Sequence, residues 1–178
     1  REYWENVEGF DGEECPIEIH FVGEVNPGYF WLFPVQEGVV NVGIGMVIAE
    51  QRKQEGMRKS LKQMQKWVIE EHPKLKNRFK DAKIISGSQK GSQLPFGSPR
   101  KNAPSFQPRR SAMAGVMCVG DSASLVDPFT GEGIGNGMVS AKLTSKYFDK
   151  EKHKHGFPND IGELYMKELW EILGKELT

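Results

Sequence analysis

The sequence predicts an α+β fold in which an antiparallel sheet carries one amphipathic helix and is joined to a partial α/β strand–turn–helix unit and a C-terminal helix. Three observations predict it. Short strand-like runs separated by turn residues lie between positions 17 and 47. Apolar residues then recur at helical spacing between positions 51 and 71. Near position 120, an apolar run leads into a glycine-rich helix start.

The antiparallel part is predicted from the N-terminal runs. Residues 17–22 alternate apolar and polar side chains, which is typical of a half-buried strand. Residues 29–34 read as an aromatic strand, and residues 39–47 as a third strand with internal glycines. The turn signal at 26–28 and the short connections favour an antiparallel meander. A further strand is predicted at 82–86.

The helices are predicted from apolar spacing. Residues 51–71 indicate an amphipathic helix, which Pro73 ends because the residue before a proline avoids the helical region. A further helix is predicted at 161–177 from its apolar spacing, and another at 133–148 because it follows a glycine-rich turn. The run 115–119 is typical of a strand that is buried on both faces of a parallel sheet.

Composition excludes several classes of function. Lys+Arg and Asp+Glu both number 24, so the chain has no net field to attract nucleic acid. The ten Phe and four Trp residues argue against wholesale disorder, and no stretch reaches the ~20 apolar residues of a membrane span. The two cysteines, Cys15 and Cys118, read as reduced buried thiols, which favours a cytoplasmic location, with membrane association as an option. A start at Arg1 indicates a fragment.

Chemistry is indicated by the segment 119–138. Asp121 follows the apolar run, at the strand end where open α/β sheets bind ligands, and its carboxylate suits a sugar-alcohol hydroxyl. Gly131 and Gly133 leave room for a flat ring to approach the backbone. The start of the following helix favours partial negative charge. The simpler interpretation is a tight strand-to-helix turn.

The joint pattern is more specific than its parts. Gly-Asp, a loop with Pro128 and a Gly-x-Gly helix start resemble the second flavin motif of the p-hydroxybenzoate hydroxylase superfamily, and residues 127–134 are similar to the form found in geranylgeranyl reductases. The resemblance implies FAD as cofactor. It implies flavin-contacting roles for a set spread over this segment, namely Asp121, Pro128, Gly131, Gly133 and Ile134.

A second resemblance lies upstream. Residues 27–34 are similar to the P-x-x-Y-x-W-x-F-P-type signature of geranylgeranyl reductases. Strand alternation puts Tyr29, Trp31 and Phe33 on one face, where they would line a channel for an isoprenoid chain. The alternative is an ordinary aromatic core face, and flavin halogenases carry a related tryptophan-rich motif.

The resemblance spans about residues 1–148 and implies a division into a substrate-binding portion at 1–110, a partial FAD-binding segment at 111–150 and a helical tail at 151–178. It implies reduction of C=C bonds in an isoprenoid or lipid substrate, with FAD reduced by an external electron donor. The superfamily's G-x-G-x-x-G fingerprint is absent from this sequence. Glu132 is close in sequence to the expected ring, but no proton donor is identified.

Other functions stay open at this point. The parent protein could be an FAD-dependent monooxygenase or halogenase, or this chain could be a non-catalytic fragment that does not retain FAD. Residues 120–124 narrowly miss the serine hydrolase G-x-S-x-G elbow, and His153 and His155 lack metal-ligand spacing. An unpaired strand at 115–119 predicts self-association. The last helix is predicted to pack against its domain, with peripheral membrane contact as the alternative.

Overall fold

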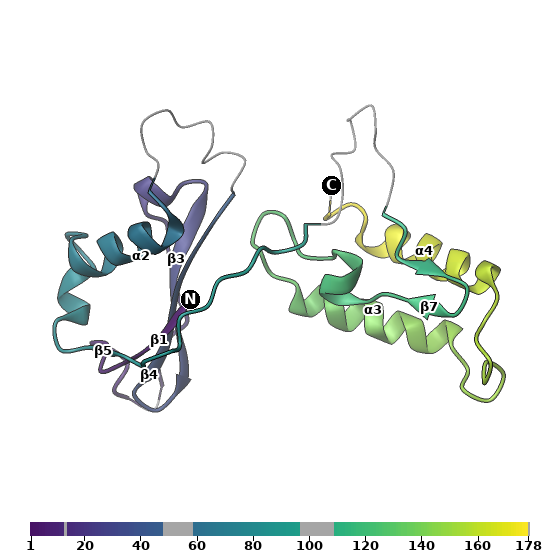
Figure 1. Ribbon diagram of the computed structural model, residues 1–178, viewed down its shortest axis with the longest axis horizontal. Coiled ribbons are helices and arrows are strands. Elements are labelled where there is room, and N and C mark those ends of the chain that lie inside the picture. The colour runs from purple at the N-terminus through teal and green to yellow at the C-terminus, as the bar shows by residue number, and fades with distance from the viewer. Residues whose placement is uncertain (13, 48–58, 97–108, 178) are drawn as a thin grey trace. The chain divides into compact units, whose positions relative to one another are not determined.

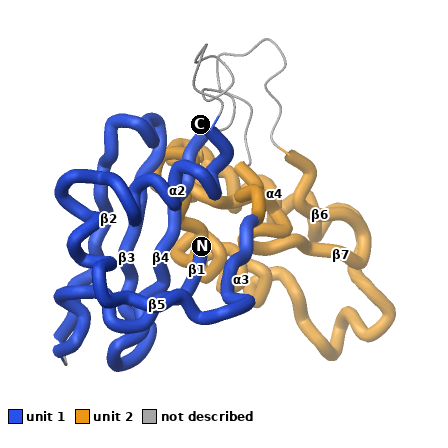
Figure 2. The backbone as a smooth tube through the Cα atoms, turned by 60° about the vertical axis from the view of Figure 1, so that its left-hand side comes forward, with its two compact units in different colours: residues 1–91 blue, residues 92–178 orange. Residues whose placement is uncertain are grey.

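The computed structural model describes residues 1–178 except 13, 48–58, 97–108 and 178 (Figure 1). The described residues form two compact units, Arg1–Gly91 and Ser92–Thr178 (Figure 2). Each unit has its own cluster of buried apolar side chains. No helix in the described ranges is both long enough and apolar enough to cross a membrane.

Unit 1 is built on a five-stranded antiparallel sheet with the order β2-β3-β4-β1-β5. The strands are β1 (Glu2–Glu5), β2 (Glu18–His20), β3 (Gly28–Gln36), β4 (Val39–Met46) and β5 (Lys83–Ile84). The predicted meander is therefore confirmed as β2-β3-β4. The sequence patterns did not predict β1, the strand at the start of unit 1, which pairs with β4.

One face of this sheet is covered by helix α2 (Leu61–Glu70), with the short 3-10 turns η1 (Gly23–Val25) and η2 (Lys76–Phe79) alongside. Ser60 caps α2 through a reciprocal pair of hydrogen bonds with Gln63, which fixes where the helix begins. The helix buries Met64, Val68 and Ile69. The predicted amphipathic helix is thus confirmed over its second half, and residues 51–58 of the prediction lie outside the described residues.

Unit 2 contains the hairpin strands β6 (Ala112–Met113) and β7 (Val116–Met117), the 3-10 turn η3 (Gly120–Ala123), and helices α3 (Ile134–Tyr147) and α4 (Asn159–Leu173). Both predicted helices are confirmed. Leu169 and Leu173 of α4 are buried in the unit's core, so this helix packs against its own unit as predicted. Phe96 bridges to the backbone of Leu125 and Val126.

The strand predicted at 115–119 differs from expectation. Its strand part, β7, is only two residues long and pairs antiparallel with β6 through a turn at Gly115, whose φ is +76°. Val116 is half exposed, so this strand is not buried on both faces. The spacing of apolar residues does not distinguish a strand of a parallel sheet from a hairpin strand that packs on a helix. The self-association derived from it stays a prediction that light scattering tests.

Candidate functional site

The predicted aromatic residues lie together on the outer face of β3. Tyr29, Trp31 and Phe33 alternate with Phe30 and Leu32, which point into the core and are fully buried. The ring centroids of Tyr29 and Trp31 are 5.8 Å apart, and those of Trp31 and Phe33 are also 5.8 Å apart with nearly parallel planes. The three side chains are half-buried and form a continuous row, which we call the aromatic row.

The aromatic row is outside the core cluster of unit 1. Its neighbours on the same face include Ile19, opposite Trp31 on β2, and Phe21, whose ring lies 6.3 Å from that of Tyr29. Ile19 is 50% exposed and Phe21 is 83% exposed. Partial burial raises the pKa of the Tyr29 hydroxyl. The face is therefore apolar, aromatic and open, whereas an ordinary core face would be closed.

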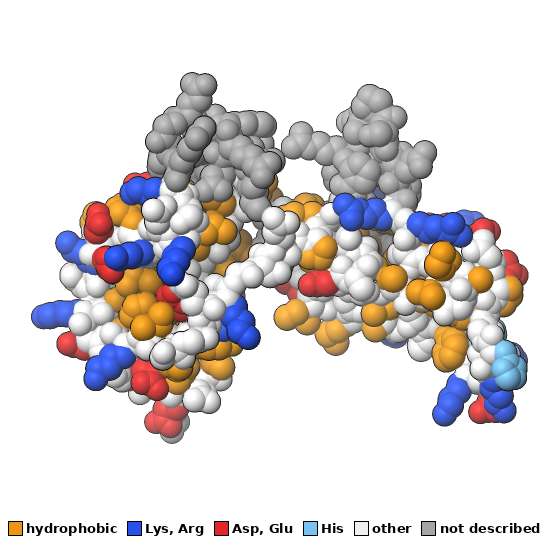
Figure 3. Space-filling view, in the orientation of Figure 1, with side chains coloured by type: hydrophobic (Ala, Val, Ile, Leu, Met, Phe, Trp, Pro, Cys, Tyr) orange, Lys and Arg blue, Asp and Glu red, His pale blue; other side chains and the backbone are white. Residues whose placement is uncertain are grey.

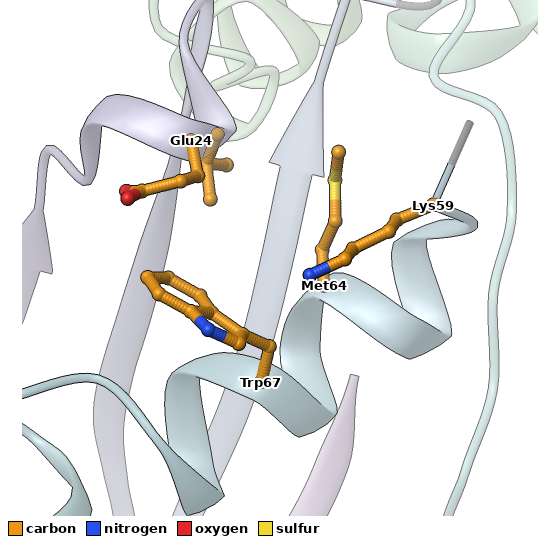
Figure 4. Close-up of a pocket in the computed structure, with 5 residues that line it drawn as sticks. Glu24, Lys59, Met64 and Trp67 are labelled. Carbon is orange, nitrogen blue, oxygen red and sulfur yellow. The ribbon is translucent and has the colours of Figure 1, made fainter. Parts of the chain in front are cut away.

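A small hollow lies on another part of unit 1, between η1 and α2 (Figure 4). Val25, Met64 and Trp67 form its apolar lining, with Glu24 and Lys59 beside them. The Lys59 ammonium stands 5.8 Å from the centroid of a Trp67 ring, a cation–π distance. These side chains pack along one side of α2, and we assign no catalytic role to them.

In unit 2, the structure brings two of the predicted flavin-contacting residues together. Asp121 lies in η3 and is exposed. A Cβ added at Gly133 would stand 3.2 Å from Asp121 Oδ1, so the carboxylate lies against the start of α3. Gly120 and Gly137 also approach closely, since a Cβ on Gly120 would be 3.4 Å from the Cα of Gly137. Glycines thus permit the close contact between η3 and α3.

The other three predicted residues lie in the loop before α3 and at its first residue, namely Pro128, Gly131 and Ile134. Pro128 is exposed, Gly131 has a φ of +75° that favours glycine, and Ile134 is 76% exposed. Phe129, at the tip of the loop, is 93% exposed. Apolar side chains lie open on the surface of this unit (Figure 3).

The loop is shaped by Asp127, which the sequence reading did not single out. Its Oδ1 accepts hydrogen bonds from the backbone N–H groups of Phe129 and Thr130, at 3.0 and 2.6 Å, and from the Thr130 hydroxyl at 2.7 Å. Partial burial opposes ionisation of Asp127, but these hydrogen bonds outweigh it and lower the pKa of the carboxyl group. The signal was available, because Asp-Pro-x-Thr is typical of an Asx turn.

Glu132 has a structural role at the start of α3. Its Oε1 accepts a hydrogen bond from the backbone N–H of Gly135 at 2.9 Å. The sequence predicts that the free N–H groups at this helix start bind a partial negative charge on a ligand. One of them, the N–H of Gly135, instead donates to a carboxylate of the chain itself. Glu132 acts here as a helix cap.

The rival sites find no support among the described residues. The Ser122 hydroxyl donates to the Val119 carbonyl at 2.7 Å, so it closes the η3 turn. His153 Nδ1 accepts a hydrogen bond from the Asp149 N–H at 3.0 Å. No group of three His, Cys, Asp or Glu side chains in the part of the chain that the structure describes is arranged to hold a metal ion.

Asp127→Ala is expected to loosen the loop at 127–132 by about 1–2 kcal/mol, because it removes the shared acceptor of three hydrogen bonds. Since the folded-state pKa of Asp127 is lowered, its stabilising contribution is present above the ordinary value of 3.8 and is lost as the pH falls through the folded-state pKa. Amide hydrogen exchange of Phe129 and Thr130 measures this. Asp127→Asn, which retains an acceptor oxygen, is the control, and unchanged exchange in Asp127→Ala would contradict the assignment.

Comparisons with known proteins support the fold and the resemblance to geranylgeranyl reductases. Residues 1–88 match the family model described as the geranylgeranyl reductase catalytic domain. The chain is 31% identical over 152 residues to a digeranylgeranylglycerophospholipid reductase of Thermoplasma acidophilum, which covers 85% of this chain and 34% of that protein. It is 27% identical to a menaquinone reductase of Mycobacterium tuberculosis over 80% of this chain and 31% of that protein.

A solved structure has the same fold. It is a geranylgeranyl bacteriochlorophyll reductase-like protein from Thermoplasma acidophilum, matched with a TM-score of 0.67 and 27% identity over 99% of this chain and 39% of that one. The α+β fold of this chain and its matches point to the same class of protein. The chain belongs to the geranylgeranyl reductase family. It spans about a third of the length of the curated relatives that it matches.

Proposed function

We propose that the chain is part of an FAD-dependent oxidoreductase that reduces C=C bonds in an isoprenoid or lipid substrate. The observation that carries this proposal is the aromatic row, a half-buried line of Tyr29, Trp31 and Phe33 that lies outside the core within the family-matched residues. The names of the relatives, which include digeranylgeranylglycerophospholipid reductases, support an isoprenoid substrate.

The physical basis of substrate binding is burial of apolar surface. An isoprenoid chain is a flexible hydrocarbon that gains about 0.8 kcal/mol for each CH₂ equivalent removed from water. Rings that are already held in place lose little conformational freedom when the chain lies against them. Trp31, at the centre of the row, has aromatic neighbours on both sides and Ile19 across from it, so it would contribute most of the contact area.

The second unit supplies residues that fit a flavin. Asp121 presents an exposed acceptor beside Gly133. Gly131 carries no side chain that would keep a flat ring away, whereas the space beside Gly133 is filled by Asp121 and Val126. Pro128 and the exposed Ile134 would lie against the ring as apolar contacts. When bound and reduced by an external electron donor, FAD supplies the hydride for the alkene. The residues described here bind and orient the ring, and none of them is assigned as the proton donor.

Binding of a polyprenyl probe tests the proposal. Geranylgeranyl diphosphate is titrated into the protein, with inorganic diphosphate as the control for the polar group. Trp31→Ala is expected to weaken binding of the polyprenyl probe at least tenfold, the loss that removal of a central aromatic contact causes. Ile84→Ala is the matched control, because Ile84 is a half-exposed apolar residue on β5 that pairs with Trp4 and lies away from the row. Equal affinities for Trp31→Ala and the wild type would refute the proposed site.

A further inference from the structure

We propose that Asn41 and Gly43 of β4 are positioning residues that set the plane of the Trp31 indole and so preform the isoprenoid-binding face. The inference rests on the proposed function and deepens it. Neither residue belongs to the aromatic row, and neither was singled out by the sequence reading. Both lie on the strand next to β3, with Gly43 directly opposite Trp31 and Asn41 opposite Phe33.

Because Gly43 has no side chain, the Trp31 indole can lie against the β4 backbone. A Cβ added at Gly43 would stand 2.2 Å from Cζ2 and 2.4 Å from Cε2 of Trp31, distances that no real side chain shows. The indole therefore lies directly over the β4 backbone. The φ of Gly43 is not in the left-handed region, so this position requires glycine for its lack of a side chain and not for its backbone conformation.

Gly45 continues the same surface. It lies opposite Tyr29, and a Cβ there would be 3.5 Å from Cζ3 of Trp31, which is ordinary contact. The benzene part of the indole thus extends along β4 from Gly43 towards Gly45. An alanine is therefore expected to leave the Trp31 indole in place at Gly45 and to displace it at Gly43, so the two glycines can be compared directly.

Asn41 fixes the remaining freedom of the ring. The Trp31 Nε1–H donates a hydrogen bond to Asn41 Oδ1 at 3.2 Å. This bond satisfies the only polar atom of the indole, so the rest of the ring presents apolar surface. With the backbone of Gly43 beneath it and Asn41 at its polar edge, the indole is held in one orientation, in which its plane lies within 24° of the Phe33 plane.

The consequence for binding is preorganisation. A row whose central ring is already fixed loses little side-chain entropy when a hydrocarbon chain lies on it. If Asn41 or Gly43 is replaced, Trp31 is still present but must be reordered on binding. Affinity for the polyprenyl probe is therefore expected to fall although no contacting group has been removed.

The test combines probe binding with a direct readout of the indole. Geranylgeranyl diphosphate is titrated into the wild type, Gly43→Ala, Asn41→Leu and Asn41→Asp, and the Trp31 indole N–H resonance is followed in ¹⁵N-labelled protein after assignment with Trp31→Phe. Gly43→Ala and Asn41→Leu are expected to shift this resonance, and to weaken probe binding roughly fivefold, the equivalent of one neutral hydrogen bond. The indole N–H should lose its protection from hydrogen exchange in Asn41→Leu, which has no acceptor, and keep it in Asn41→Asp, which has one.

Gly23→Ala is the matched control, because Gly23 has open space around its Cβ position and no positive φ. Its affinity and indole resonance are expected to equal those of the wild type. If the wild type binds the probe and Trp31→Ala does not, but Asn41→Leu and Gly43→Ala bind as well as the wild type with a shifted indole resonance, the positioning role is overturned and the proposed function stands. If the wild type fails to bind the probe, the proposed function itself fails.

Discussion

Phe30→Ala is expected to lower the free energy of unfolding of unit 1 by about 3–5 kcal/mol. Phe30 is fully buried between the sheet and the helical side of the unit, and its ring meets the edge of Phe79 at a centroid distance of 6.4 Å. Removal of the ring leaves a cavity in a close-packed core that can collapse only in part. The loss is a large fraction of the about 5–15 kcal/mol that stabilises an ordinary domain, so the hydrogen-exchange protection of unit 1 should fall strongly.

Residue-resolved amide hydrogen exchange measures this effect in the intact chain, because it reports on each unit separately. Unit 2 has its own core and is expected to keep its protection, which makes it an internal reference. Phe21→Ala is the matched control, since Phe21 is 83% exposed and should cost below about 1 kcal/mol. Equal protection of unit 1 in Phe30→Ala and Phe21→Ala would contradict the core assignment.

Raising the pH from 10 to 12 is expected to destabilise unit 2 through Tyr165 by on the order of 2 kcal/mol. Burial, with a smaller contribution from nearby Cys118, raises the pKa of the Tyr165 hydroxyl from 10.0 to about 12. The hydroxyl donates a hydrogen bond to the Cys118 carbonyl at 2.8 Å, which only the protonated form can do. The unfolded chain therefore loses its proton first as the pH rises, and the stabilising contribution, complete below pH 10, is lost through pH 12.

Tyr165→Phe separates this effect from general alkaline unfolding. The variant keeps the buried ring and loses the titrating group, so it should be less stable than the wild type by about 1 kcal/mol at pH 8. Between pH 10 and 12 the difference between the two proteins should shrink and then reverse, as judged by hydrogen exchange or denaturant unfolding of unit 2. A parallel pH dependence in both proteins would show that Tyr165 does not titrate as its burial requires.

Local patterns predicted the elements that are long and periodic. The strand at Gly28–Gln36 and the helix at Asn159–Leu173 were found because their apolar spacing is repeated over enough residues. Strand β1 was missed, since a four-residue run carries little periodicity and its pairing with β4 joins segments that are far apart in sequence. Such pairings depend on tertiary structure, which local propensity does not contain.

The part of the candidate site that lies on one strand could be predicted from the sequence, and the part that depends on strand pairing could not. Alternation alone placed Tyr29, Trp31 and Phe33 on one face, and the structure puts their rings in contact. The roles of Asn41 and Gly43 follow from the register between β3 and β4, which no local pattern specifies. The run at 115–119 was misassigned because an apolar segment of that length fits either a parallel sheet or a hairpin packed on a helix.

The most direct test of an isoprenoid site on the outer face of β3 is photo-cross-linking with a polyprenyl diphosphate that carries a diazirine on its hydrocarbon chain. After irradiation and digestion, mass spectrometry locates the adducts. Adducts are expected on Ile19, Tyr29 and Trp31, and competition by unlabelled geranylgeranyl diphosphate, but not by inorganic diphosphate, should remove them. Adducts confined to other surfaces, such as the exposed side chains of α4, or labelling that is not competed, would contradict the assignment of this face as the substrate site.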